Sequence, residues 1–159
     1  MESRLNPFKA APKAYQAMAA LGHYADSSGL ERPLLELVKM RSSQINGCAY
    51  CLDMHSKDAR ALGETEQRLY LLDAWRESPF YTDRERAALE WTEAVTLITE
   101  GHVADDVYER VTLQFTPEEL ANLTLAIVTI NGWNRLSIAF RIKPGSYQSN
   151  LQPLTKSAT

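Results

Sequence analysis

The sequence predicts an all-α fold, a compact single-domain bundle of about six to seven helices. Apolar residues recur at helical spacing, and not in alternation, through most of the chain. The clearest start signal is Thr116–Glu119, where an N-cap threonine is followed by proline and two glutamates. The length of 159 residues suits one domain with a substantial core.

Glycine and proline residues divide the first half of the chain. We expect an N-terminal arm over residues 1–12, followed by helices over about 13–27, 33–45 and 48–62. Pro33 suits an early helical position. The Asn46–Gly47 pair could form a hairpin turn, but its flanks lack alternating apolar residues. We interpret it as a helix–helix junction in which Asn46 or Gly47 caps the next helix, which ends at Gly63.

The second half of the chain contains four further predicted helices, over about 64–78, 82–100, 104–115 and 119–142. Thr82 or Asp83 caps the second of these, in which Ala87, Trp91 and Ile98 fall on one apolar stripe. The last segment is rich in β-branched residues and could be a buried strand. Its length favours a helix.

The closing helix is apolar on most of its faces. Such a helix belongs in a core or at a subunit interface, so we expect the protein to form a homo-oligomer. The Lys143–Gly145 turn ends this helix, so the domain spans residues 13–145. Residues 146–159 form a flexible C-terminal tail in this prediction.

The composition excludes several classes of function. Apolar residues make up 45% and charged residues 23%, an ordinary globular balance. The net charge of −3 and the absence of a Lys/Arg-rich run argue against nucleic acid or a membrane as a partner. No signal peptide or membrane span is recognisable, so we expect a cytoplasmic protein. In that compartment a lone CxxC is more often catalytic or metal-binding than structural.

Both cysteines and one of the three histidines lie in the ten residues NGCAYCLDMH. Cys48, Cys51 and His55 fall within about 60° of one another on a helical wheel, at the start of a predicted helix. The helix N-terminus stabilises a thiolate, the reactive form of cysteine. Two cysteines at this spacing can approach disulfide distance, and His55 is one turn from Cys51 and can exchange a proton with it.

Two other interpretations of this stretch remain open. The cysteines and the histidine could simply pack in the core, because free cysteine is often a plain core residue. Alternatively, Cys48, Cys51 and His55 could bind Zn²⁺ together with Glu36, although paired CxxC spacing is missing. Haem attachment is excluded because Leu52, not histidine, follows the second cysteine. On the helical wheel alone, Glu36 is an ordinary surface glutamate paired with Lys39.

The spacing Glu36–x11–Cys48–x2–Cys51–x3–His55 resembles the signature of the alkylhydroperoxidase D family, within the carboxymuconolactone decarboxylase-like superfamily. The resemblance covers about residues 33–63, and INGWNRLSIAF is similar to the closing helix of that family. It implies an all-helical homo-oligomer, often a trimer or hexamer. Members with this signature reduce organic hydroperoxides or peroxynitrite through the dithiol, with electrons from a thiol donor such as a lipoyl carrier.

The resemblance also implies a role for each motif residue. Cys51 attacks the peroxide, Cys48 resolves it in a redox-active Cys48–Cys51 disulfide, and His55 and Glu36 relay protons. The helix dipole alone would favour Cys48 as the attacking thiol. Tyr50 stands where the best-studied members carry a second histidine, which leaves the relay and the substrate open.

The sequence therefore predicts a thiol-dependent peroxidase that needs no bound cofactor or metal. Its partners would be a small hydroperoxide and an external dithiol donor, such as a lipoyl carrier or a thioredoxin-like protein. Tyr50 and Trp133 are candidate substrate-binding residues, although large aromatic residues such as Trp91, Tyr108 and Trp133 are usually core. The alternatives are a general dithiol–disulfide oxidoreductase and a non-enzymatic oligomer that binds a metal or a small ligand.

Overall fold

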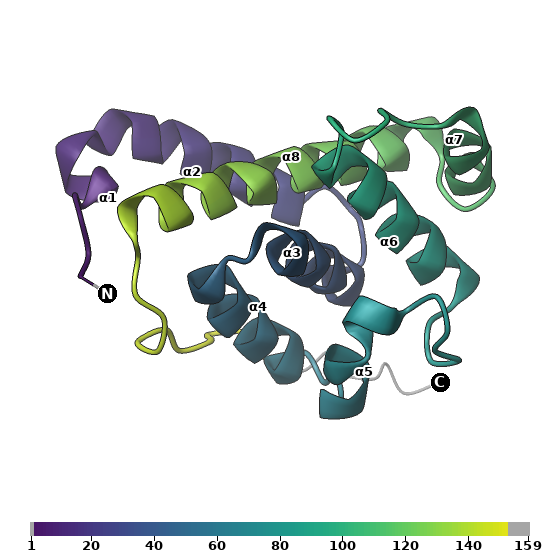
Figure 1. Ribbon diagram of the computed structural model, residues 1–159, viewed down its shortest axis with the longest axis horizontal. Coiled ribbons are helices and arrows are strands. Elements are labelled where there is room, and N and C mark those ends of the chain that lie inside the picture. The colour runs from purple at the N-terminus through teal and green to yellow at the C-terminus, as the bar shows by residue number, and fades with distance from the viewer. Residues whose placement is uncertain (1, 153–159) are drawn as a thin grey trace.

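The computed structural model describes residues 2–152, and this part of the chain is helical and contains no strand (Figure 1). In chain order the elements are α1 (Pro7–Ala10), α2 (Pro12–Asp26), α3 (Arg32–Asn46), α4 (Ala49–Ala61), α5 (Glu66–Tyr70), the 3₁₀ turn η1 (Leu72–Ala74), α6 (Asp83–Thr96), α7 (Asp105–Thr112) and α8 (Pro117–Phe140). The all-α prediction is confirmed.

Helix α3 is the central element of the bundle. It lies between α8, the longest helix, and α4, while α6 flanks it on a third side (Figure 1). Leu35 and Val38 pack in one core cluster with Leu123 and Ile127 of α8. Leu37, on the other side of α3, packs in a second cluster with Leu72, Trp75 and Leu89. Because α3 is covered on several faces, it buries polar residues as well, among them Glu36, Lys39 and Ser42.

The predicted caps are present at both long C-terminal helices. Thr82 and Glu85 form a capping box at the start of α6, and Thr116 and Glu119 form another at the start of α8. Gly47 ends α3 in the left-handed conformation, with φ of 67°, which glycine adopts without strain. The helix–helix junction predicted at Asn46–Gly47 is therefore confirmed.

Four predicted boundaries were wrong in detail. The helix expected over 64–78 is broken into α5 and η1, because Leu69, Leu72 and Trp75 are buried at spacings of three, which a 3₁₀ turn keeps on one face. Helix α6 ends at Thr96, so Ile98 lies beyond it and is exposed. Helix α8 ends at Phe140, with Arg141 in the left-handed conformation. Cys48, and not Asn46 or Gly47, caps α4.

The segment predicted as an N-terminal arm contains the short helix α1. Asn6 caps α1 through its side chain, and the chain before it is tied to the end of α8. The backbone N–H of Arg4 donates to the carbonyl of Phe140 at 3.1 Å, and its guanidinium donates to the carbonyl of Ala139 at 3.0 Å. The division into arm, domain and tail stays a prediction, and residues 153–159 lie outside the described part.

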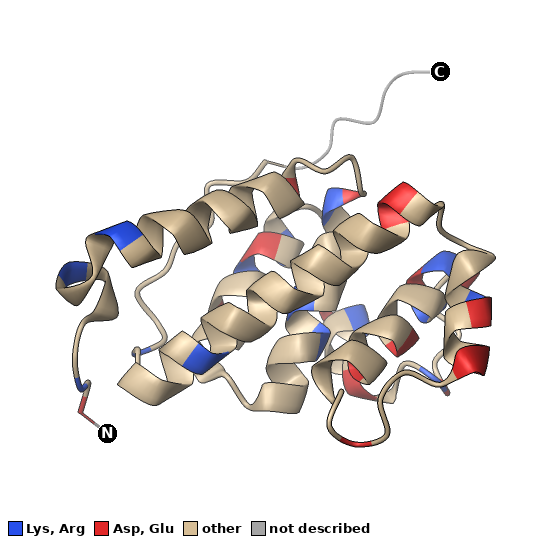
Figure 2. Cartoon of the chain, turned by 90° about the horizontal axis from the view of Figure 1, so that it is seen from above, with Lys and Arg blue, Asp and Glu red and all other residues tan. Residues whose placement is uncertain are grey.

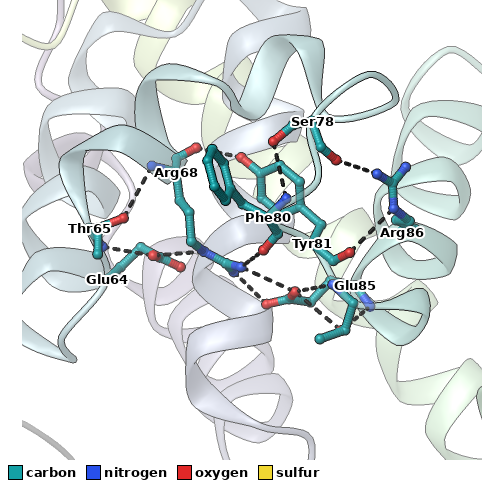
Figure 3. A network of polar contacts seen from close by, with 9 residues as sticks. Glu64, Thr65, Arg68, Ser78, Phe80, Tyr81, Glu85 and Arg86 are labelled. Atoms are coloured by element: carbon teal, nitrogen blue, oxygen red, sulfur yellow. Dashed lines mark hydrogen bonds and ion pairs between the residues drawn. The ribbon is translucent and has the colours of Figure 1, made fainter.

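A polar network fixes the irregular connection between α5 and α6 (Figure 3). Arg68 of α5 lies at its centre and forms ion pairs with Glu64 at 2.9 Å and Glu85 at 2.5 Å. Its guanidinium also donates to the carbonyl of Phe80, while the Tyr81 hydroxyl donates to the carbonyl of Arg68. The network holds residues 75–82 against the core without a helix in that stretch.

Helices α2 and α8 contain few charged residues along their length, whereas charged residues are frequent in and around α6 and α7 (Figure 2). None of the helices among residues 2–152 has the length and apolar character that crossing a membrane requires. The homo-oligomer stays a prediction, carried by the same apolar character of α8.

Candidate functional site

The dithiol lies at the start of α4. Cys48 is the N-cap residue, and its sulfur accepts a hydrogen bond of 3.4 Å from the backbone N–H of Cys51. Sγ of Cys51 contacts the Ser137 hydroxyl of α8 at 3.8 Å. Both cysteines are free thiols and only 1% exposed. The dithiol therefore occupies the helix N-terminus that the sequence predicted, in a site closed by α8.

A chain of buried charged groups leads to His55 from the side of α3. Glu36 is 1% exposed, so its interpretation as a surface glutamate was wrong. One carboxylate oxygen contacts Nδ1 of His55 at 2.8 Å, and the other accepts from Nζ of Lys39 at 2.8 Å. Lys39 in turn pairs with Asp26 at 2.6 Å. Packing of α4 against α3 brings Glu36 and His55 together across nineteen positions of sequence.

The charge state of Glu36 sets the orientation of the histidine. Burial alone would raise the pKa of Glu36, but hydrogen bonds and charges from His55 and Lys39 lower that pKa from 4.5 to about 2. An ionised carboxylate only accepts hydrogen bonds, so Nδ1 of His55 must donate. This arrangement leaves the other ring nitrogen, Nε2, to exchange a proton at the cavity.

The two thiols differ in acidity. The pKa of Cys48 is lowered from 9.0 to about 7, chiefly by a hydrogen bond from the Cys51 thiol, with further donors at the Cys51 backbone, Ser137 and Asn134. The pKa of Cys51 is raised, because its proton is shared with the Cys48 sulfur and because it is buried. The pair thus releases its first proton near neutral pH and holds the second one strongly.

The Cys51 cavity, as we call it, has a volume of about 340 Å³. Cys51, His55 and Glu36 line it, together with the two candidate substrate-binding residues Tyr50 and Trp133. Three aromatic rings from different helices extend the wall, since Tyr15 packs edge-to-face on both Phe8 and Trp133. Trp91 and Tyr108 do not line it. Trp91 is buried in the core, and Tyr108 is exposed.

A second cavity, the Cys48 cavity, has a volume of about 410 Å³ and lies between the start of α4 and the chain that follows α8. Its lining residues are Gly47, Cys48, Ala49, Tyr50, Ser137, Ile138, Arg141, Ile142, Lys143 and Pro144. The two cysteines, three residues apart, therefore open onto different cavities.

Sequence reasoning missed three residues of the site. Asp58, one turn after His55, lies on the same buried side of α4 as Cys51 and His55, a position where a carboxylate is unusual. Ser137 is a polar residue within the apolar α8. Tyr147 had no detectable signal, because it belongs to the predicted tail. Its hydroxyl donates to both oxygens of Asp58 at 2.8 and 3.0 Å, which brings residues 145–151 across α4 to the cavity (Figure 1).

The zinc interpretation finds little support in the site. Within residues 2–152, the one group of potential ligands that comes together is Glu36, His55 and Asp58, whose ligand atoms lie within 4.8 Å, and it includes neither cysteine. Lys39 already contacts Glu36, and Tyr147 already bonds both oxygens of Asp58. A divalent cation would have to compete with both contacts.

Titration of the thiols should separate the dithiol from two ordinary cysteines. The ultraviolet absorbance of thiolate should rise by one equivalent with a midpoint at pH about 7, because the hydrogen-bonded pair loses its first proton there. Ser137→Ala removes one of the donors and should move this midpoint upward. Two equivalents that appear together near the ordinary pKa of 9.0 would contradict the hydrogen-bonded pair.

The chain is an all-helical protein with a dithiol at a helix start beside a buried carboxylate–histidine pair. The chain matches the model of the carboxymuconolactone decarboxylase family over residues 12–94, and it belongs to that family, in its AhpD-like branch. The family match covers the whole Glu36–His55 signature.

Among the proteins that the chain resembles, two share nearly half of their residues with it. YdfG of Bacillus subtilis strain 168 is 46% identical over 139 residues, covering 87% of this chain and 95% of YdfG. The crystal structure of ATU0492 from Agrobacterium tumefaciens, a protein of unknown function assigned provisionally to AhpD antioxidant defence, is 46% identical. It superposes with a TM-score of 0.89 over 92% of this chain and 100% of ATU0492.

A more distant structural neighbour shows that this fold serves other chemistry. The debrominase Bmp8 superposes with a TM-score of 0.76 over 85% of this chain and 73% of its own, at 21% identity. At that identity the likeness establishes the fold alone.

Proposed function

We propose that this protein is a thiol-dependent peroxidase that reduces organic hydroperoxides. The observation that carries the proposal is the meeting of Cys51 with the Glu36–His55 pair on the wall of one cavity. Reduction of an alkyl hydroperoxide needs a thiolate, a proton donor and a pocket with an apolar wall for the alkyl group. The AhpD-like relatives support the same assignment.

The reaction would begin at Cys51. Its thiolate attacks the terminal oxygen of the peroxide, the O–O bond breaks, and the alkoxide leaves as an alcohol with a proton from His55. Cys51 becomes a sulfenic acid. The Cys48 thiolate then attacks the Cys51 sulfur and displaces hydroxide, which takes a proton from the solvent and leaves as water, and a disulfide forms. An external dithiol supplies the two electrons that restore the pair.

The positions of the two thiols and their pKa values favour different cysteines as the one that attacks the peroxide. Cys48 has the lower pKa, but Cys51 lies in the cavity that contains His55. We assign the attack to Cys51, because its proton can pass to His55, which lines the same cavity, whereas Cys48 does not line that cavity. In this assignment the acidic Cys48 stays a thiolate, ready to resolve the sulfenic acid.

Turnover of cumene hydroperoxide with dithiothreitol tests the proposal. We expect consumption of the peroxide in proportion to protein, with a Cys48–Cys51 disulfide as the first oxidised product under stoichiometric peroxide. The matched comparison is reduction of a small disulfide under the same conditions, which a general dithiol–disulfide oxidoreductase would favour. If stoichiometric peroxide oxidises neither thiol, the proposed peroxidase activity is wrong.

A further inference from the structure

The chain that follows α8 forms one wall of the Cys51 cavity. We call residues 145–151 the strap, and two of its residues, Tyr147 and Leu151, line that cavity. Burial alternates along the strap: Tyr147, Ser149 and Leu151 are half-buried, whereas Ser146, Gln148 and Asn150 are exposed. This alternation is typical of an extended chain, in which successive side chains point to opposite sides. One side of the strap therefore faces the bundle and the other faces solvent.

Two contacts with α4 hold the backbone of the strap. The backbone N–H of Gly145 donates to Oδ2 of Asp53 at 2.9 Å, and Nζ of Lys57 donates to the carbonyl of Tyr147 at 3.0 Å. Within residues 2–152, no backbone-to-backbone hydrogen bond ties residues 143–152 to another element. A segment held by so few bonds opens at a lower free-energy cost than a packed helix.

The side chain of Tyr147 supplies a third contact. Its hydroxyl donates to both carboxylate oxygens of Asp58, at 2.8 and 3.0 Å. Burial and this hydrogen bond raise the pKa of Tyr147, so the hydroxyl keeps its proton and remains a donor at neutral pH. The contact fixes the tyrosine ring as part of the cavity wall.

The strap differs from the rest of the wall. Every other residue that lines the Cys51 cavity belongs to a helix, namely α1, α2, α3, α4 or α8. Those helices pack against one another, so they cannot retreat from a large ligand without disturbing the core. The strap can retreat by breaking its three contacts with α4. The size of this cavity therefore depends on the position of the strap.

We propose that Tyr147 and Leu151 are specificity-determining residues that restrict the Cys51 cavity to compact hydroperoxides. The inference rests on the peroxidase proposed above, because it names the substrate class of the same site. The cavity volume of about 340 Å³ is at the lower end of the roughly 300–1,000 Å³ found for small-molecule sites. A long-chain hydroperoxide has to displace the strap, and the broken contacts weaken its binding.

Binding of the product alcohols tests this wall without any redox step. Cumyl alcohol is the product of a compact hydroperoxide, and hydroxylated linoleate is the product of a long-chain one. In Leu151→Ala, we expect the affinity for hydroxylated linoleate to rise about tenfold relative to that for cumyl alcohol, because the shorter side chain enlarges the cavity. Leu151→Trp should instead weaken the binding of cumyl alcohol. Calorimetric titration of the reduced protein measures both affinities.

Tyr147→Phe tests the contact with Asp58, because it keeps the ring and removes only the hydroxyl. The loosened strap should shift the preference toward hydroxylated linoleate, as Leu151→Ala does. The matched control is Gln148→Ala, which shortens a side chain on the exposed side of the same strap. This variant should bind both alcohols as the wild type does.

Single-turnover oxidation of the reduced protein by cumene hydroperoxide and by linoleic acid hydroperoxide should show the same order of preference. An unchanged preference between the alcohols in both Leu151→Ala and Tyr147→Phe would overturn the inference, and so would a wild type that binds no cumyl alcohol. A shifted preference between the alcohols, without oxidation of either thiol by the hydroperoxides, would support the size limit of the cavity and count against the peroxidase.

Discussion

Cys51→Ser should abolish peroxide turnover, with a loss of at least about 10³-fold, the scale seen when a catalytic nucleophile is removed. The serine hydroxyl can still donate to the Cys48 sulfur, so the remaining thiol should keep much of its acidity. Loss of reactivity would then follow from the position of Cys48 outside the Cys51 cavity, and not from a missing thiolate. Peroxide consumption by the purified variant measures the effect.

Cys48→Ser is the matched variant, because it keeps the attacking sulfur and removes the resolving one. Stoichiometric peroxide should leave a sulfenic acid on Cys51, which a dione reagent traps and mass spectrometry locates. The wild type should show little adduct, since the Cys48–Cys51 disulfide forms first. Rapid adduct formation on Cys48 in Cys51→Ser would instead make the more acidic thiol the attacking one and reverse the two roles.

The helical spacing and the five-part motif allowed most of the fold and the central residues of the site to be predicted. Apolar periodicity and the Thr116–Glu119 cap depend on residues close together in the sequence, so they can be recognised without a structure. The spacing from Glu36 to His55 can be recognised in the same way, because a single turn at Gly47 joins α3 to α4. The pair meets at 2.8 Å across that turn.

Features that depend on tertiary packing were beyond the sequence. The helical wheel alone made Glu36 a surface residue, and only the packing of α3 against α4, where Glu36 contacts His55, makes its position an interior one. The break between α5 and η1 depends on the core that receives Leu69 and Leu72. Tyr147 reaches Asp58 across 89 positions, and the Cys48 cavity exists because the chain after α8 turns back toward α4.

The structure also changes the expectation for Glu36, which now has two separable roles. Through Nδ1 of His55 it fixes the imidazole, and through Lys39 it neutralises a buried cation. Glu36→Gln keeps the shape and removes the charge. The rate of peroxide oxidation should fall on the order of 10²-fold, the usual contribution of general acid–base catalysis. Single-turnover oxidation of the reduced variant, measured below its unfolding temperature, tests this.

The same substitution should destabilise the fold, because it leaves Lys39 with Asp26 alone. The depression of the pKa of Glu36 from 4.5 to about 2 corresponds to roughly 3 kcal/mol of unfolding free energy. A carboxyl group whose pKa is lower in the folded state stabilises the fold at every pH above the pKa that it has in the unfolded chain. The stability gap between wild type and variant should therefore be full above pH 4.5 and close as the pH falls toward 2. Denaturant unfolding across that range measures it.

Lys39→Gln separates the two roles, because it breaks the same ion pair and leaves the Glu36–His55 contact in place. It should lose stability on the same scale as Glu36→Gln, since a buried partner is again left uncompensated. Its rate of peroxide oxidation should fall much less, because the carboxylate that orients Nδ1 of His55 is still present. Equal loss of rate in both variants would mean that Glu36 serves only to hold α3 and α4 together. A small rate effect in Lys39→Gln beside a large one in Glu36→Gln would place Glu36 in the proton relay, acting through His55 on the sulfur one turn away.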